Sequence, residues 1–208
     1  MSSTEEMILT DMELDALREL GNIGTGHATT ALAEMTGVRI AIRVPDISVI
    51  SITEIPRLVG EEEIMAGLFF ELSGDTTDYI QLLFAQDSAL ALVDILMGRE
   101  IGSTRALSGM DESALMEIGN ILTSAFATAW ADFLGITLIT SPPTLAFDMA
   151  GAVMDYVLAR VGMVADQVIL FKTVFEGESN LFSGYFMLVP NPESLKNVLK
   201  MLGGQIDE

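Results

Sequence analysis

The sequence predicts one internally duplicated α/β (α+β) domain with pseudo-two-fold symmetry, built on a mainly antiparallel six-stranded sheet and two long helices. Three observations predict it. A shift of 98 residues places 15–28 on 113–126, with identical Glu, Gly and Asn at matched positions. Each copy combines long helical periodicity with runs of branched apolar residues. Neither copy has enough apolar residues for a core of its own, so the 208 residues are expected to form a single domain.

The two repeats are expected at about 10–98 and about 109–204. The segment between them, about 99–109, is polar and contains two Ser, one Thr and two Gly, as is typical of a linker. The end of each repeat aligns at a longer shift of 105, so the second repeat has gained about seven residues after its proline.

In the first repeat, a capping box of Thr10 and Glu13 predicts a long helix that runs to about Thr36 and stops at Gly37. Turn and strand signals predict the rest of this repeat. Those elements are a strand over 38–44 closed by Pro45, a short helix over 52–59, hairpin strands over 64–72 and 79–85, and a helix from 87 or 88 to 98.

The second repeat is expected to follow the same order of elements, with a longer second helix. They are a long helix over 110–134 stopped by Gly135, a strand over 136–140, a helix over 147–161, hairpin strands over 167–175 and 181–189, and a last helix over 192–203.

Each long helix carries an acid and an amide on one exposed stripe. Residues spaced by four and seven share a helix face, so Asp15, Glu19 and Asn22 project together. The matching residues of the second helix are Ser113, Glu117 and Asn120. Asn is unfavourable in the middle of a helix, and two copies at matched positions suggest a function. From periodicity alone, ordinary exposed residues retained by a recent duplication explain the pattern equally well.

Composition excludes several classes of function. The chain has no Cys and only one His, His27, which excludes disulfides, thiolate metal sites and His-rich centres, so no metal or cofactor of its own is expected. A net charge of −20 disfavours nucleic acid and anionic lipid as partners. The longest uncharged runs, 118–131 and 133–147, are shorter than the ~20 apolar residues of a membrane-spanning helix, and a cytoplasmic protein without membrane insertion is expected.

The glycines of the first long helix do not form a phosphate-binding loop. Gly21, Gly24 and Gly26 have the wrong spacing for such a loop, and no Lys follows them. Close packing, or the close approach of a partner, is the expected role of these glycines. His27 is expected to be an ordinary surface or satisfied histidine rather than a base, because the second repeat has Ala125 at its position.

The pattern Asp/Ser-x-x-x-Glu-x-x-Asn, followed by a proline after 22 intervening residues, occurs in both repeats. The prolines are Pro45 and Pro143. This arrangement resembles the signature of the CheC phosphatase family of prokaryotic chemotaxis, which includes CheC, CheX and FliY. The resemblance covers essentially the whole chain.

The resemblance implies a hydrolase that removes the aspartyl phosphate of the phosphorylated response regulator CheY. In this family the Asn orients the attacking water, a role that would fall to Asn22 and Asn120. The Glu pairs with a lysine of the receiver, a role that would fall to Glu19 and Glu117. Asp15 and Ser113 would support helix geometry or docking. The Mg²⁺ and the phosphorylated Asp would belong to CheY, which agrees with the expectation that this chain has no cofactor of its own.

The resemblance also implies a second partner, the receptor deamidase CheD. Family members bind it through a helix after the second motif proline, and residues 147–154 resemble that helix. Asp148, Met149 and Gly151 would contact CheD, whereas an ordinary amphipathic core helix is the alternative interpretation.

Two other functions remain as alternatives. A non-catalytic adaptor would bind CheY, CheD or motor proteins through the same helices. A self-contained metal-dependent hydrolase is far less favoured, because the acidic residues are scattered along the sequence.

Overall fold

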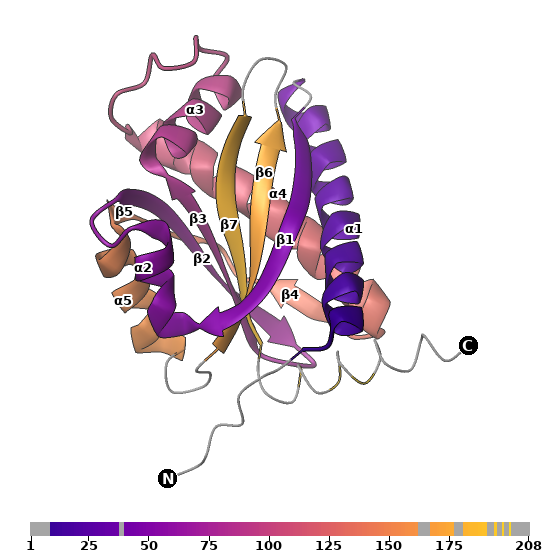
Figure 1. The fold of residues 1–208 in the computed structure, drawn as a ribbon. Helices are drawn as coiled ribbons and strands as arrows, with labels where there is room; N and C mark the ends of the chain where they lie inside the picture. Colours follow the sequence, from indigo (N-terminus) through magenta and orange to yellow (C-terminus); the bar gives the residue numbers. More distant parts are fainter. Residues whose placement is uncertain are drawn as a thin grey trace.

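The computed structural model describes residues 9–37, 40–161, 167–176 and 181–190, together with Ser194, Asn197 and Lys200. Figure 1 shows the arrangement of the helices and strands. In chain order they are α1 (Asp11–Thr36), β1 (Ala41–Ser51), a 3-10 turn (Ile52–Glu54), α2 (Ile55–Val59), β2 (Ile64–Gly74), β3 (Asp78–Ala85), α3 (Gln86–Leu96), α4 (Gly109–Leu134), β4 (Leu138–Thr140), β5 (Thr144–Met149), α5 (Ala150–Val161), β6 (Gln167–Glu176) and β7 (Leu181–Val189). Of the predicted last helix, only the three single residues lie in the described part, and all three are helical.

The sheet joins strands from both halves of the sequence. Its order is β1-β6-β7-β3-β2-β4, with β5 also paired to β2, and every pairing is antiparallel. The outer strand of each half therefore lies against the hairpin of the other half. The predicted α/β class with a mainly antiparallel sheet is confirmed. The repeat boundaries stay a prediction.

The sheet has seven strands rather than the expected six, because one strand of the second half is interrupted. A shift of 98 places β1 on β4 and β5 together. Between Thr140 and Thr144 the strand is interrupted by Ser141, Pro142 and Pro143. The expected helix over 147–161 is accordingly wrong at its start, since Phe147–Met149 belong to β5 and α5 begins at Ala150.

The prediction that Pro45 closes the first strand is also wrong. β1 continues to Ser51, and a bulge between Arg43 and Asp46 accommodates the proline. Proline is tolerated at this position because β1 is an edge strand, where an amide facing away from the sheet has no ladder partner.

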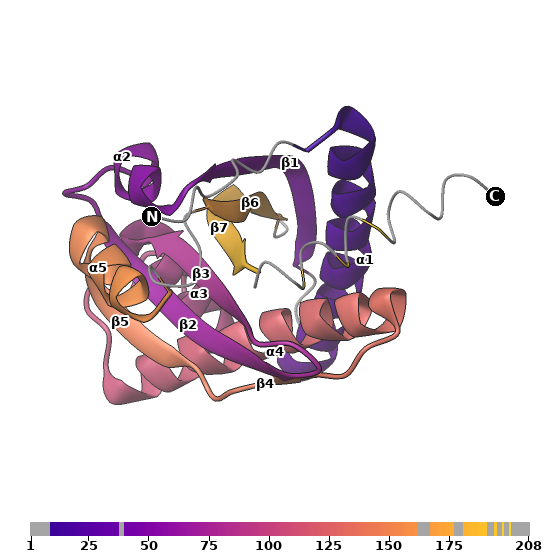
Figure 2. The same ribbon diagram turned by 90° about the horizontal axis from the view of Figure 1, so that it is seen from below.

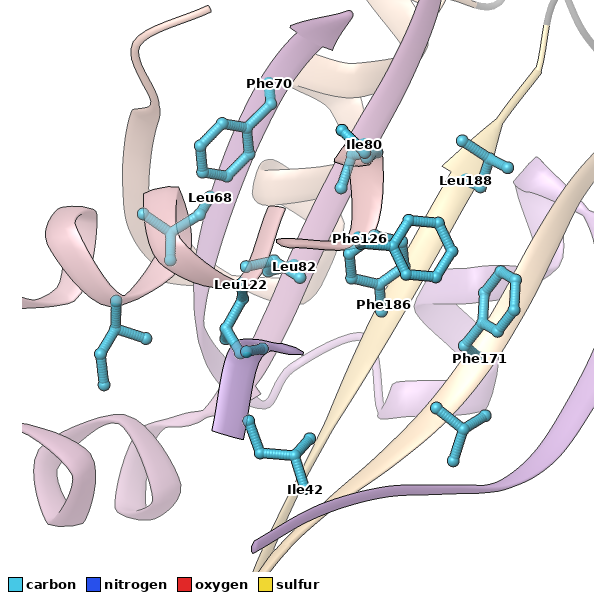
Figure 3. Packing of buried hydrophobic residues seen from close by; sticks show 14 of the residues in the cluster. Ile42, Leu68, Phe70, Ile80, Leu82, Leu122, Phe126, Phe171, Phe186 and Leu188 are labelled. Atoms are coloured by element: carbon cyan, nitrogen blue, oxygen red, sulfur yellow. The ribbon is translucent and has the colours of Figure 1, made fainter. Parts of the chain in front are cut away.

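Helices cover both faces of the sheet. Apolar side chains of α1, α3 and α4 pack on one face, and those of α2 and α5 pack on the other. Seen from below in Figure 2, α2 and α5 lie on one side of the curved sheet and α1 and α4 on the other. In the larger cluster, Phe126 of α4 lies with its ring centroid 4.2 Å from that of Phe186 and 5.3 Å from that of Phe171. Figure 3 shows these three rings among the buried side chains.

The long helices begin and end where the sequence predicts. Thr10 and Glu13 form the capping box of α1, and Ser108 and Asp111 form that of α4. Left-handed glycines end both helices, Gly37 with φ 69° and Gly135 with φ 64°. Among the described residues, no helix is both long enough and apolar enough to cross a lipid bilayer.

Glycines let the long helices lie close to their neighbours. A Cβ atom at Gly21 would lie 3.3 Å from the Phe171 ring, and one at Gly24 would lie 3.1 Å from the Cα of Phe126 in α4. Gly119 faces Leu68 in the same way. The expected packing role is therefore met at Gly21 and Gly24. Because the buried glycines face inward, the adjacent Asn22 and Asn120 lie toward the surface side of their helices.

Candidate active sites on the two long helices

The first site lies on the outer face of α1. Glu19 and Asn22 are exposed, whereas the neighbouring Leu17 and Leu20 are buried in the core. The side-chain oxygen Oδ1 of Asn22 accepts a hydrogen bond from the backbone N–H of Val44, with a donor–acceptor distance of 3.4 Å. The predicted amide and carboxylate therefore reach the surface together, and the edge strand β1 holds the amide.

Asp15 does not extend freely from this site. Its Oδ1 lies 2.6 Å from Nη1 of Arg18, and both side chains are well exposed. An exposed ion pair of this kind contributes little stability. The contact nevertheless keeps the Asp15 carboxylate on its own helix, and the supporting role of Asp15 stays a prediction.

The second site lies in a shallow pocket. Glu117 is exposed and Asn120 is half-buried on α4. The pocket has a volume of about 390 Å³ and is formed by α4 and the connection between β4 and β5. Its lining residues are Ser113, Met116, Glu117, Asn120, Thr140, Ser141, Pro142 and Pro143. Four predicted site residues, Ser113, Glu117, Asn120 and Pro143, are thus brought together.

Ser113 bonds within its own helix. Its Oγ donates to the carbonyl oxygen of Gly109 at 2.9 Å. Met116 occupies the position that Arg18 has in α1, so this site lacks the ion pair of the first. The two sites share their Glu and Asn but differ in the residues around them.

The two motif prolines occupy the same kind of bulge. In β1 one extra residue lies between Arg43 and Asp46 relative to the partner strand β6. In the second half, Ser141 bonds to Glu71 through both its backbone N–H, at 2.8 Å, and its Oγ, at 2.9 Å, before Thr144 pairs with Phe69. Each proline therefore lies where an outer strand carries one extra residue relative to its partner strand.

Sequence reasoning missed the wall of the second pocket. Thr140, Ser141 and Pro142 line it, and none was a candidate. The signal was the pair of dipeptides at matched positions, Val44-Pro45 and Pro142-Pro143, where only the first has an amide N–H before the motif proline.

The site residues do not form a metal cage. Within the described ranges, no group of three or more His, Asp or Glu side chains converges as a metal ligand set would. Each site offers one Glu and one Asn, which can pair with a cation on a partner and orient a water molecule.

The segment proposed for CheD forms an exposed corner rather than one helix. Phe147, Asp148 and Met149 are exposed on β5, and Gly151 is half-buried in the first turn of α5. The Asp148 side chain bonds to the adjacent backbone, since its Oδ1 accepts a hydrogen bond from the N–H of Met149 at 2.8 Å. The loop after α2 caps the N-terminus of α5, because the N–H groups of Ala150 and Gly151 donate to the carbonyls of Glu63 and Glu61.

Comparison with known proteins finds similarity in both halves of the chain. A family model described as the CheC-like family matches residues 12–49 and 110–146, which contain both Glu/Asn pairs and both motif prolines. The chain is 29% identical over 199 residues to the CheY-P phosphatase CheC of Bacillus subtilis (strain 168), with 93% of this chain and 95% of the relative covered.

Solved structures share the fold. The crystal structure of Thermotoga maritima FliY matches with a TM-score of 0.78 and 22% identity, covering 95% of this chain and 99% of that one. The FliM middle domain from H. pylori matches with a TM-score of 0.66 and 12% identity, covering 93% of this chain and 99% of that one. These structures confirm the fold, and the family model together with the Bacillus subtilis relative confirms the resemblance of this chain to the CheC-like family.

Proposed function

We propose that this chain is a chemotaxis phosphatase that hydrolyses the aspartyl phosphate of the phosphorylated response regulator CheY. The observation that carries the proposal is the presentation of a Glu and an Asn together on the outer side of each long helix. The name of the similar Bacillus subtilis protein, CheY-P phosphatase CheC, supports the choice of substrate.

The proposed chemistry needs only positioning and charge. The oxygen of a water molecule forms a bond to phosphorus, the bond from phosphorus to the aspartyl oxygen breaks, and the water proton passes to the released phosphate. Asn22 or Asn120 orients that water, as a carboxamide does in GTPases. Glu19 or Glu117 pairs with a lysine of the receiver and fixes the docked geometry. The Mg²⁺ that neutralises the phosphoryl oxygens is supplied by CheY.

The charge of the chain suits a receiver that presents a cation beside its phosphorylation site. Thirty acidic residues against ten basic ones give a net charge of −20. Attraction between this surface and a basic rim accelerates encounter, and the effect is strongest at low salt.

The test is the decay of a phosphorylated CheY receiver with and without this protein. The combined variant Asn22→Ala and Asn120→Ala is expected to lose most of the acceleration. Thr30→Ala with Thr128→Ala is the matched control, because both threonines are exposed on the same helices and, within the described part of the chain, bond only to their own helix carbonyls at 3.1 and 2.8 Å. Wild-type acceleration by the double Asn variant would refute the assignment. Tight binding of the phosphorylated receiver without faster decay would favour the adaptor function.

A second partner, CheD, is proposed at the corner of β5 and α5. Phe147, Asp148 and Met149 are all exposed there, so the end of β5 offers two apolar side chains and one carboxylate to a partner. Asp148→Lys is expected to weaken CheD binding by at least about tenfold, because it inverts the exposed charge. Unchanged affinity in a titration of CheD would refute this surface.

A further inference from the structure

The two candidate sites treat their Asn side chains differently. In the first site the N–H of Val44 donates to Oδ1 of Asn22 at 3.4 Å. The amide of Ile42 likewise donates to Oγ1 of Thr29 at 3.2 Å. Both N–H groups lie on the outer edge of β1, which has no neighbouring strand in the described part of the chain. Side chains of α1 therefore accept the hydrogen bonds that a further strand would otherwise accept.

The second site cannot form the equivalent bond. A shift of 98 places Asn22 on Asn120 and Val44 on Pro142. Proline has no backbone N–H, so the donor that engages Asn22 is absent beside Asn120. Asn120 lines the pocket together with Pro142, and among the described residues its side chain makes no hydrogen bond.

The difference concerns the part of the side chain that the reaction uses. A carboxamide has one oxygen that accepts and one NH₂ group that donates. An attacking water keeps its lone pair directed at phosphorus only if it donates a hydrogen to an acceptor, which in this motif is the Asn oxygen. That oxygen has two lone pairs. At the first site the N–H of Val44 engages one of them, whereas at the second site both are available to water.

We propose, building on the function proposed above, that the backbone group beside each Asn sets the activity of its site. The N–H of Val44 lowers the availability of the Asn22 oxygen to water, whereas Pro142 has no N–H that could engage the Asn120 oxygen. The Glu117/Asn120 site therefore carries most of the hydrolysis. Val44 and Pro142 are positioning residues, because they act through the Asn side chains.

The first test compares single variants in the receiver dephosphorylation assay. Asn120→Ala is expected to lower kcat more than Asn22→Ala, by roughly 2- to 10-fold, the size of one competing neutral hydrogen bond. An Asn22→Ala variant that loses as much activity as Asn120→Ala, or more, would overturn the inference and leave the proposed function intact. If neither variant slows hydrolysis, the proposed function itself fails.

The second test exchanges the backbone group. Val44→Pro in the Asn120→Ala background recreates the Pro-Pro dipeptide of the second half and is expected to raise kcat. Pro142→Val in the Asn22→Ala background restores a donor and is expected to lower kcat. KM should stay unchanged in both, because Glu19 and Glu117 still dock the receiver. A change in KM alone, or no change in kcat, would contradict a positioning role.

A third measurement does not depend on catalysis or on the folding of the proline variants. Amide hydrogen exchange at Val44 is expected to accelerate roughly 2- to 10-fold in Asn22→Ala, since the acceptor of that amide is removed. Exchange at Ile42, whose acceptor Thr29 is retained, is the internal control. An unchanged Val44 exchange rate would show that the bond does not form in solution and would overturn the inference.

Discussion

At the scale of single residues, Glu and Asn have different tasks in the proposed function. Glu19 and Glu117 are exposed carboxylates with no hydrogen bond to the described part of the chain, which leaves them available to a cation on a partner. Glu19→Gln with Glu117→Gln is expected to raise KM for the phosphorylated receiver roughly 10- to 100-fold, because a hydrogen bond to a charged group is lost. Steady-state kinetics check this, and a fall in kcat at unchanged KM would contradict the docking role.

A buried carboxylate fixes the linker at the same scale. Asp94 is fully buried and accepts bonds from Gly102, Ser103 and Thr104 of the connecting segment at 2.7–3.1 Å. Burial by itself raises the pKa of Asp94, but the bonds from Thr104, Ser103 and Gly102 outweigh it and the pKa lies below its ordinary value. These hydrogen bonds to Asp94 therefore stabilise the fold only while its carboxylate is ionised.

Acid should weaken the protein through this residue. A carboxylate whose pKa is lower in the folded state adds stability above the unfolded pKa of about 4, and that stability is lost as pH falls through the folded value. Asp94→Asn is expected to cost about 2–3 kcal/mol of unfolding free energy at pH 7 and less at acidic pH. Urea unfolding at pH 7 and pH 3 measures this, and an equal loss at both pH values would contradict the role of the charge.

Asp111 contributes in the same direction. The backbone and side chain of Ser108 donate to its Oδ2 at 2.8 and 2.7 Å, and these bonds hold the pKa of Asp111 below its ordinary value. Its Oδ1 lies 2.8 Å from Arg99, an ion pair without the alignment of a hydrogen bond. This group, too, stabilises the fold above its unfolded pKa and ceases to do so as pH falls.

At the scale of elements, α1 and α4 depend on small residues for their crossing. Gly24→Ala is expected to lower stability by about 1–3 kcal/mol, because its Cβ would lie 3.1 Å from the Cα of Phe126, a backbone atom that cannot turn aside. Gly26→Ala, two residues away with open space around it, should raise stability by about 0.5–1 kcal/mol through helix propensity. Thermal unfolding of both variants decides, and a stable Gly24→Ala would show that the helices cross less closely.

Element prediction succeeded where local chemistry decides and failed where pairing decides. The capping boxes and left-handed glycines of α1 and α4 are local, so their ends were predictable from the sequence. The strand that runs through Pro45 and the strand before α5 were not, because edge position and pairing to β2 allow them. The same nonlocal pairing brings Thr140 and Ser141 to the second pocket, which no spacing along the chain indicates.

At the scale of the whole molecule, charge is the dominant feature. Because a net charge of −20 is spread over 208 residues, the acidic side chains of the folded chain repel one another, and salt screens that repulsion. The unfolding midpoint is expected to rise as NaCl increases from 10 to 500 mM, by about 2–4 °C for each kcal/mol gained. Differential scanning calorimetry across this series checks it, and a flat or falling midpoint would show that self-repulsion does not limit stability.

In the proposed function the Asn side chains act on the reaction and the Glu side chains act on docking. The most direct test measures binding and hydrolysis separately, with the Asn22→Ala/Asn120→Ala variant and a phosphorylated receiver. We expect binding within about twofold of wild type, together with phosphate release close to the receiver's own rate. Phosphate release at the wild-type rate, or a loss of binding that accounts for the whole loss of release, would contradict it.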